Sequence, residues 1–204
     1  MNALLLLDRS LAQPSGSSSS KLEMGTVIDR YKRPEGWVRS WRDFTSSTLA
    51  VAGLRRTIGW TVPAFKQTAA EIYGAVGAAF AAGDLGALKR LTTPSCHAVM
   101  RDALKSRADG ERHEWETLDV RTSIKQVRIG NHKSTPGRQF AQVTCSIDAT
   151  LIWSVFDRHG KRVGGMGSSE EPHALNDLWV FERCISEPAE KSPTWRLKEK
   201  LPTE

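Results

Sequence analysis

With 204 residues and a net charge of +6, the chain has room for one well-buried domain and an extension, but not for two full-sized domains. Hydrophobic residues make up 39% and charged residues 25%, a balance that excludes fibrous and low-complexity proteins. No stretch approaches the ~20 apolar residues that cross a bilayer, and the three cysteines form no paired motif for a disulfide framework or a zinc site.

The basic excess is concentrated in the N-terminal third of the chain. Residues 1–68 hold ten Lys and Arg against five Asp and Glu, whereas residues 114–204 hold thirteen of each kind. A basic extension on a neutral domain suits an anionic partner, either nucleic acid or an acidic lipid surface. A solvated tail without a partner is the alternative.

Residues 1–35 are predicted to be a disordered or presequence-like linker. The serine run at residues 17–20 follows Pro14 and Gly16, and such a segment buries too little apolar area to offset the entropy of ordering. Arg9 is the only basic residue among the first twenty, which makes this segment a poor match to a mitochondrial presequence.

Residues 36–62 are predicted to form a basic, amphipathic helical extension. One face follows the spacing of three and four residues that is typical of a helix, and its members are Trp37, Trp41, Phe44, Thr48, Val51, Arg55 and Ile58. Indole rings suit headgroup depth in a membrane interface and guanidinium groups bind phosphates, so this segment suits a membrane or RNA. The contact residues we expect are Trp37, Arg39, Trp41, Arg42, Arg55 and Arg56. Packing of the helix onto its own domain is the alternative.

The domain itself is predicted to span residues 63–202 and to begin with three helices. Pro63 suits the first turn of a helix over residues 63–82, which Gly83 ends. A short helix over residues 84–91 follows, and Thr93, Pro94 and Ser95 open a third helix that ends near residue 107.

Beyond His113 the hydrophobic period changes to two. Residues 141–155 alternate between the two faces of a strand, which predicts a long half-buried strand. Further strands are predicted at 118–129, 161–166, 178–185 and 195–201, with a hairpin turn at 157–160. Three helices followed by antiparallel strands predict an α+β fold in which the helices pack on a curved antiparallel sheet, cone-shaped and NTF-two-like.

The order of these elements and several short motifs resemble the mitochondrial translocase-subunit-forty-four-like (Tim44-like) family. The motifs are Gly83-Asp84, Phe140-Ala141-Gln142-Val143, Leu178-Trp179-Val180-Phe181-Glu182-Arg183 and Trp195-Arg196-Leu197. The last two are the most specific, and the resemblance covers residues 64–201.

This resemblance implies a peripheral binding protein on the matrix side of the mitochondrial inner membrane. The family includes the import-motor anchor, and also the large-subunit mitochondrial ribosomal protein forty-five with its fungal ribosome-receptor relatives. The chain looks more like the ribosomal branch, because no long charged coiled-coil region precedes its domain. The expected function is therefore a non-enzymatic structural or tethering component of the mitochondrial large ribosomal subunit, which supports translation and membrane insertion of the products. An import-motor anchor is the alternative.

The partners that the resemblance implies are the ribosomal RNA and neighbouring proteins of that subunit, together with the lipids of the inner-membrane surface. A nascent chain or an insertase is a further candidate partner. We expect no small-molecule substrate, no cofactor, no catalytic residue and no metal site.

Cone-shaped domains also occur as small enzymes or ligand-binding domains, in which a carboxylate or a histidine in a pocket does acid–base work. The predicted inward face of the long strand carries Cys145, Ile147, Leu151 and Trp153, and it lacks an acid–base pair. The aromatic residues Trp153, Trp179, Phe181 and Trp195 are expected to line a concave pocket, with filling of the core as the alternative.

No histidine is expected to act as a ligand. Cys96 and His97 are adjacent on a predicted helix and point about a hundred degrees apart, whereas a metal needs three or four converging ligands. The other histidines, His113, His132, His159 and His173, lie in predicted turns or at segment edges and are expected to be exposed.

Overall fold

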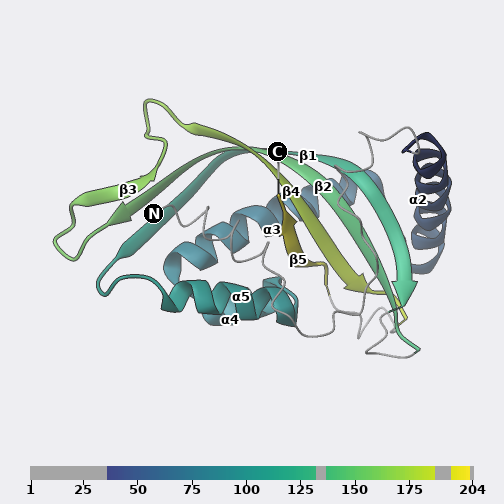
Figure 1. Cartoon of the computed structure of the whole chain (residues 1–204), viewed down its shortest axis with the longest axis horizontal. Coiled ribbons are helices and arrows are strands. Elements are labelled where there is room, and N and C mark those ends of the chain that lie inside the picture. Colours follow the sequence, from purple (N-terminus) through teal and green to yellow (C-terminus); the bar gives the residue numbers. More distant parts are fainter. Residues whose placement is uncertain (1–35, 132–136, 187–193, 203–204) are drawn as a thin grey trace.

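The computed structural model describes residues 36–131, 137–186 and 194–202, with side chains described from residue 47 on. The predicted linker, residues 1–35, lies outside the described residues. The described helices are α2 (Gly36–Ile58), α3 (Val62–Ala82), α4 (Leu85–Leu91) and α5 (Pro94–Lys105). The described strands are β1 (Arg112–Asn131), β2 (Gln139–Phe156), β3 (Arg162–Met166), β4 (His173–Cys184) and β5 (Arg196–Leu201). The predicted α+β class is confirmed, since helices pack on a curved antiparallel sheet (Figure 1).

The sheet has the order β1-β2-β4-β5, and β3 also pairs with β2. β1 follows β2 along its whole length, from the pair Arg112–Phe156 at one end to Asn131–Gln139 at the other. β3 and β4 pair with the opposite edge of β2 in succession, with the loop 167–172 between them. β2 is therefore the central strand, and its two ends define the two ends of the molecule.

The long strand β2 confirms the predicted inward face, but it is more than half-buried, because Gln142, Thr144 and Ser146 on its other face are buried as well. Every second residue from Ala141 to Val155 is buried in the core that lies between the sheet and the helices. β1 begins six positions earlier than predicted, at Arg112, and it carries bulges after Thr117 and after Ile124. Each bulge shifts the inward face by one residue, so the apolar side chains of β1 do not follow a simple period of two.

Capping residues set the helix boundaries close to the predicted positions. The hydroxyl of Thr61 accepts the N–H of Ala64 at 3.4 Å at the start of α3, and Gly83 ends that helix with a φ of 72°. Asp84 then begins α4, because its carboxylate accepts the N–H of Ala87 at 2.8 Å.

Two glycines of α3 are expected to respond to alanine in opposite ways. A Cβ at Gly77 would overlap the indole ring of Trp115, whereas a Cβ at Gly74 would meet only the Thr117 hydroxyl, at 3.8 Å. Gly77→Ala should therefore lower the free energy of unfolding by about 1–3 kcal/mol through overpacking. Gly74→Ala should raise it by about 0.5–1 kcal/mol through helix propensity. Urea denaturation of the two variants measures both effects, and equal signs would contradict the packing of α3 on β1.

Helix α2 packs against the outer edge of β1, so the predicted extension is joined to the domain. The Ser47 hydroxyl lies 3.3 Å from the Val127 carbonyl and 3.4 Å from the Val127 N–H. Ala50 and Leu54 are buried in the core. This confirms, for the described side chains, the alternative in which the helix packs on its own domain.

The face of α2 that packs inward agrees with the predicted one in part, because Val51 and Ile58 pack against the core as predicted. Thr48 and Arg55 were predicted to share the apolar face, but both are exposed. The inward face also carries Ser47, Ala50 and Leu54, and the small side chains of Ser47 and Ala50 allow close approach to the strand edge. The predicted spacing was therefore right for Val51 and Ile58 and wrong for Thr48 and Arg55.

Candidate binding surfaces

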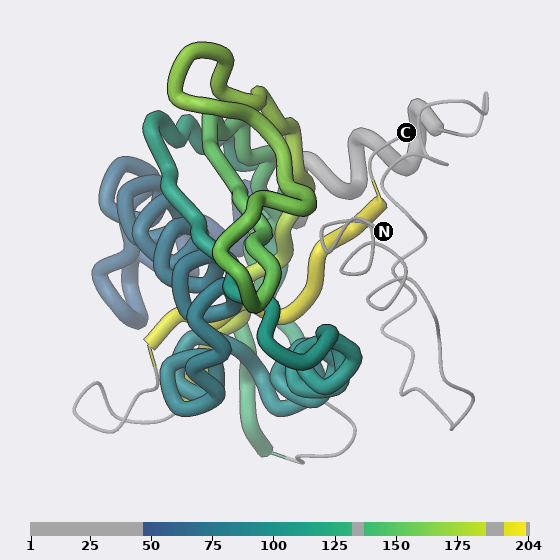
Figure 2. Tube along the Cα trace, turned by 90° about the vertical axis from the view of Figure 1, so that its left-hand side faces the viewer, coloured from purple at the N-terminus to yellow at the C-terminus, as the bar shows by residue number. Residues whose placement is uncertain are grey.

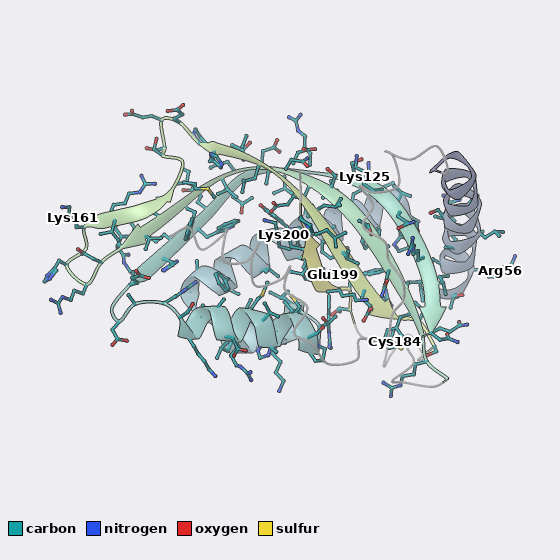
Figure 3. All side chains as sticks on the ribbon, in the orientation of Figure 1. Arg56, Lys125, Lys161, Cys184, Glu199 and Lys200 are labelled. Atoms are coloured by element: carbon teal, nitrogen blue, oxygen red, sulfur yellow. The ribbon has the colours of Figure 1, made fainter. Side chains whose placement is uncertain are left out.

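The outer face of α2 is the first candidate site, and it combines two arginines with an exposed leucine. Leu49 is 74% exposed, and Arg55 and Arg56, six and seven residues further along, are exposed as well. Arg56 points away from the sheet at one end of the molecule (Figure 3). Leu49 and Arg56 are seven residues apart, which is two helical turns, so they lie on the same face.

This outer face has the chemistry of an anion-binding surface. No acidic residue occurs between Ser47 and Ala70, so no nearby carboxylate of the same segment competes for the arginines. Guanidinium groups bind phosphate oxygens through two parallel hydrogen bonds. An exposed leucine beside them adds apolar contact, as in helices that lie in a membrane interface.

The predicted contact residues of this segment divide into two sets. The structure leaves both Arg55 and Arg56 exposed on α2, where Arg56 shares the face of Leu49 and Arg55 lies about a hundred degrees around the helix from Arg56. The other four, Trp37, Arg39, Trp41 and Arg42, belong to the first turns of the same helix, but their side chains lie outside the described part of the structure. Their contact with RNA or a membrane stays a prediction.

The predicted pocket residues lie in the buried core under α3. All four, Trp153, Trp179, Phe181 and Trp195, belong to the core cluster. The ring of Phe65 lies 4.7 Å from that of Trp195 and 5.8 Å from that of Phe181. Tyr73 lies 4.7 Å from Trp179. Side chains of α3 thus occupy the concave face beside these aromatic rings, as the core-filling alternative expects.

The sequence analysis missed a buried ion pair on the inward face of the sheet. The Asp177 carboxylate lies 3.1 Å from the Lys200 ammonium, and their side chains are only 3% and 10% exposed. The cross-strand register places Lys200 opposite Trp179, and Asp177 lies two residues before Trp179 on the same face of β4. Burial, and then the nearby Asp177 charge, raise the pKa of Tyr73, so the phenol stays neutral.

The sequence did contain a signal for this pair. Trp179 and Phe181 are inward residues of β4, and a period of two extended backward places Asp177 on the same face. The strand was predicted to begin at Leu178, which left Asp177 outside it. β4 begins at His173 instead, because its pairing with β2 continues to Leu151.

His113 is buried, so the prediction that it is exposed is wrong. Its ring lies 5.7 Å from that of Trp153, and its Nε2 lies 3.4 Å from a carboxylate oxygen of Glu111. Burial is the main cause that lowers the pKa of His113, so the imidazole is neutral at physiological pH. The reason for the error is that β1 begins at Arg112 and turns the next side chain into the core.

The three cysteines are buried, and burial lowers the nucleophilic reactivity of two of them. Cys96, Cys145 and Cys184 are all free thiols. Burial raises the pKa of Cys96 and of Cys145 to about 12, and Glu199 adds to the shift of Cys96. Since the thiolate is the reactive form, these two groups are poor nucleophiles at physiological pH.

Two searches of the described residues bear on membranes and metals. None of the described helices is both long and apolar enough to cross a membrane. Within residues 36–131, 137–186 and 194–202, no group of three His, Cys, Asp or Glu side chains is placed to hold a metal ion.

Comparison with known proteins identifies the family. A family model described as Tim44-like domain matches residues 51–201. The chain therefore belongs to the Tim44-like domain family, and the resemblance seen in the sequence is confirmed at this level. The match begins inside α2, close to the core residues Ala50 and Leu54. Membership in this family points to an association with the mitochondrial inner membrane.

Two further comparisons complete these findings. A crystal structure of the intermembrane space region of the chloroplast protein ARC6 is similar with a TM-score of 0.41 and 12% sequence identity. That alignment covers 67% of this chain and 94% of the other. No curated protein matches the chain.

Proposed function

We propose that this protein is a non-enzymatic tether that holds the mitochondrial large ribosomal subunit at the matrix face of the inner membrane. The observation that carries the proposal is the outer face of α2, which presents Leu49, Arg55 and Arg56 to solvent. Its opposite face is fixed to β1 through Ser47 and Leu54. A rigidly attached basic face can transmit a docking contact to the whole domain, whereas a flexible tail cannot.

The interior supports the non-enzymatic part of the proposal. Lys200 holds the Asp177 carboxylate, and burial keeps the thiols of Cys96 and Cys145 protonated. These groups contribute to a closed core instead of facing an open site. The Tim44-like family supplies the link to the inner membrane.

An import-motor anchor is the second candidate function, because the matching family model bears the name of a translocase subunit. Both functions would use the same basic face of α2 beside the membrane. They differ in the partner that the domain carries, which is a ribosomal subunit in one case and an import channel in the other.

Sedimentation of detergent-solubilised mitochondria on sucrose gradients tests the proposal. The tagged wild-type protein should migrate with large-subunit markers at low salt, and Arg55→Glu/Arg56→Glu should move it to light fractions. A matched control is Arg101→Glu/Lys105→Glu, which changes two exposed cations of α5 and should leave migration unchanged.

The salt dependence distinguishes the forms of this function. Co-migration that survives high salt supports a resident subunit, and release by salt supports a peripheral receptor. If the wild-type protein stays in light fractions at both salt concentrations, the ribosomal proposal is wrong and the import-motor anchor becomes the better candidate.

A further inference from the structure

A second basic surface lies at the other end of the sheet, at the hairpin between β2 and β3. Residues 158–164 are all exposed, and three of them are the cations Arg158, Lys161 and Arg162. Figure 3 shows Lys161 at the end of the molecule opposite Arg56. In Figure 2 the same hairpin is the part of the sheet nearest the viewer. We call residues 157–163 the basic hairpin.

Local hydrogen bonds give the basic hairpin a defined shape. The Asp157 carboxylate accepts the N–H groups of His159 at 2.8 Å and of Lys161 at 2.9 Å. Gly160 supplies the positive φ of 76° that the turn requires. The carboxylate of Asp157 is thus directed into the turn, while the cationic side chains of the hairpin are exposed.

The basic hairpin and the outer face of α2 are too far apart to act as one surface. α2 contacts β1 at Val127, whereas the hairpin continues from Phe156, which pairs with Arg112. The stretch of β1 between Arg112 and Val127 spans roughly 50 Å at ~3.3 Å per residue. This distance exceeds the ~8 Å Debye length at physiological salt, so the two fields are independent. Figure 1 shows the same separation along the longest axis.

We propose that the basic hairpin binds the phosphate backbone of RNA. Arg158 and Arg162 offer guanidinium groups, which pair with phosphate oxygens through the N–H groups that are not donated to His159 or to the carbonyls of Gly164 and Gly167. Lys161 adds a point charge. A narrow hairpin can reach the phosphates of a single-stranded loop or those across the shallow minor groove of an RNA helix. The inference rests on the proposed function, in which a ribosome-bound domain needs an RNA contact away from the membrane.

Lipid is the less suitable partner for the basic hairpin. Val163, which is 55% exposed, is the only large aliphatic residue in the segment, and residues 157–163 contain no Trp, Tyr or Phe. A membrane-interface segment normally combines basic residues with several apolar or aromatic anchors. The hairpin has the charges but lacks the anchors.

Neighbouring carboxylates limit the direction from which a phosphate can approach. Glu170 and Glu171 are exposed in the loop 167–172, and Asp109 lies next to Gly110, which packs against Arg158. These acids repel phosphate, so the contact belongs to the tip of the hairpin. Removal of these acids should therefore raise the affinity for RNA, whereas removal of the cations should lower it. The acid variants thus serve as a control with the opposite expected change in affinity.

The test measures binding of the full chain to a fluorescent single-stranded RNA oligonucleotide over a range of salt concentrations. Arg158→Gln/Lys161→Gln/Arg162→Gln should weaken binding about tenfold to a hundredfold at 0.1 M salt. The plot of log association constant against log salt concentration should become less steep by about 2 units of slope, because three phosphate contacts are lost and each contributes ~0.7. Glu170→Gln/Glu171→Gln should tighten binding without lowering that slope.

Two controls keep the result interpretable. Lys89→Gln/Arg101→Gln/Lys105→Gln removes three exposed cations from α4 and α5 and should leave the slope unchanged. Lys161→Gln alone should lower the slope by about 0.7, and it spares the contacts that Arg162 makes with the carbonyls of Gly164 and Gly167.

The proposal is overturned if the triple hairpin variant binds RNA with an unchanged slope. It is also overturned if that variant loses binding to vesicles of anionic phospholipid while RNA binding is unaffected, which would assign the hairpin to lipid. Failure of the proposed function looks different, because wild-type protein would then stay in light gradient fractions while the hairpin variants still changed the RNA slope.

Discussion

Leu54→Ala is expected to lower the free energy of unfolding by about 2–5 kcal/mol, because the Leu54 side chain is 0% exposed in the core beneath α2. The matched control is Leu49→Ala in the same helix, which removes a side chain that is 74% exposed and should change stability by less than about 0.5 kcal/mol. Urea denaturation followed by tryptophan fluorescence measures both variants.

The same pair of variants separates stability from binding. Leu49→Ala should weaken attachment to the membrane or the ribosome without loosening the fold, since Leu49 lies on the outer face of α2. Equal stability of the Leu54→Ala variant and the wild type would show that α2 is not part of the folded unit. In that case the rigid attachment that the proposed function requires would be lost.

Asp177→Ala is expected to lower the free energy of unfolding by about 3–5 kcal/mol. The substitution removes the carboxylate that lies 3.1 Å from the Lys200 ammonium, and the Lys200 side chain is only 10% exposed. Removal of one member of a buried ion pair is the costly case, because Lys200 loses the carboxylate that lies next to its charge. Chemical denaturation at neutral pH gives the size of the loss.

A double substitution identifies the cause of that loss. Asp177→Leu/Lys200→Met replaces both charges with apolar side chains of similar size, and it should recover most of the stability. A double variant that is as unstable as Asp177→Ala would show that the cost comes from shape and packing around Trp179, and that the ion pair contributes little.

Local chemistry in the sequence predicted the helices of the domain and its central strand. Pro63, Gly83 and Asp84 act through the backbone of their own neighbourhood, so their effect is visible without any tertiary contact. The alternation along β2 is visible for the related reason that one face of the strand is buried over its whole length.

The errors arose where distant parts of the chain determine the environment. The inward face of α2 depends on the edge of β1, more than seventy residues away, which no local pattern encodes. The bulges of β1 interrupt its alternating pattern, so the start of the strand at Arg112 and the burial of His113 were not predicted. Asp177 is polar in an otherwise apolar stripe, and only its partner Lys200 on another strand makes that position acceptable.

The same distinction applies to the candidate binding surfaces. The exposed arginines of α2 were predicted from composition, because charged side chains rarely enter a core. The basic hairpin could have been found from Arg158, Lys161 and Arg162 beside the predicted turn. Its position at the far end of the sheet from α2 is a property of the three-dimensional register.

The contact between Ser47 and Val127 covers part of the outer edge of the sheet. An outer strand presents unpaired N–H and C=O groups that can recruit a strand from another molecule. The single hydroxyl of Ser47 occupies both groups of Val127, so at this point a helix takes the place of a missing strand. A partner that displaced α2 from the domain would expose the unpaired N–H and C=O groups of β1. A chain shortened to begin after α2 would expose these groups permanently.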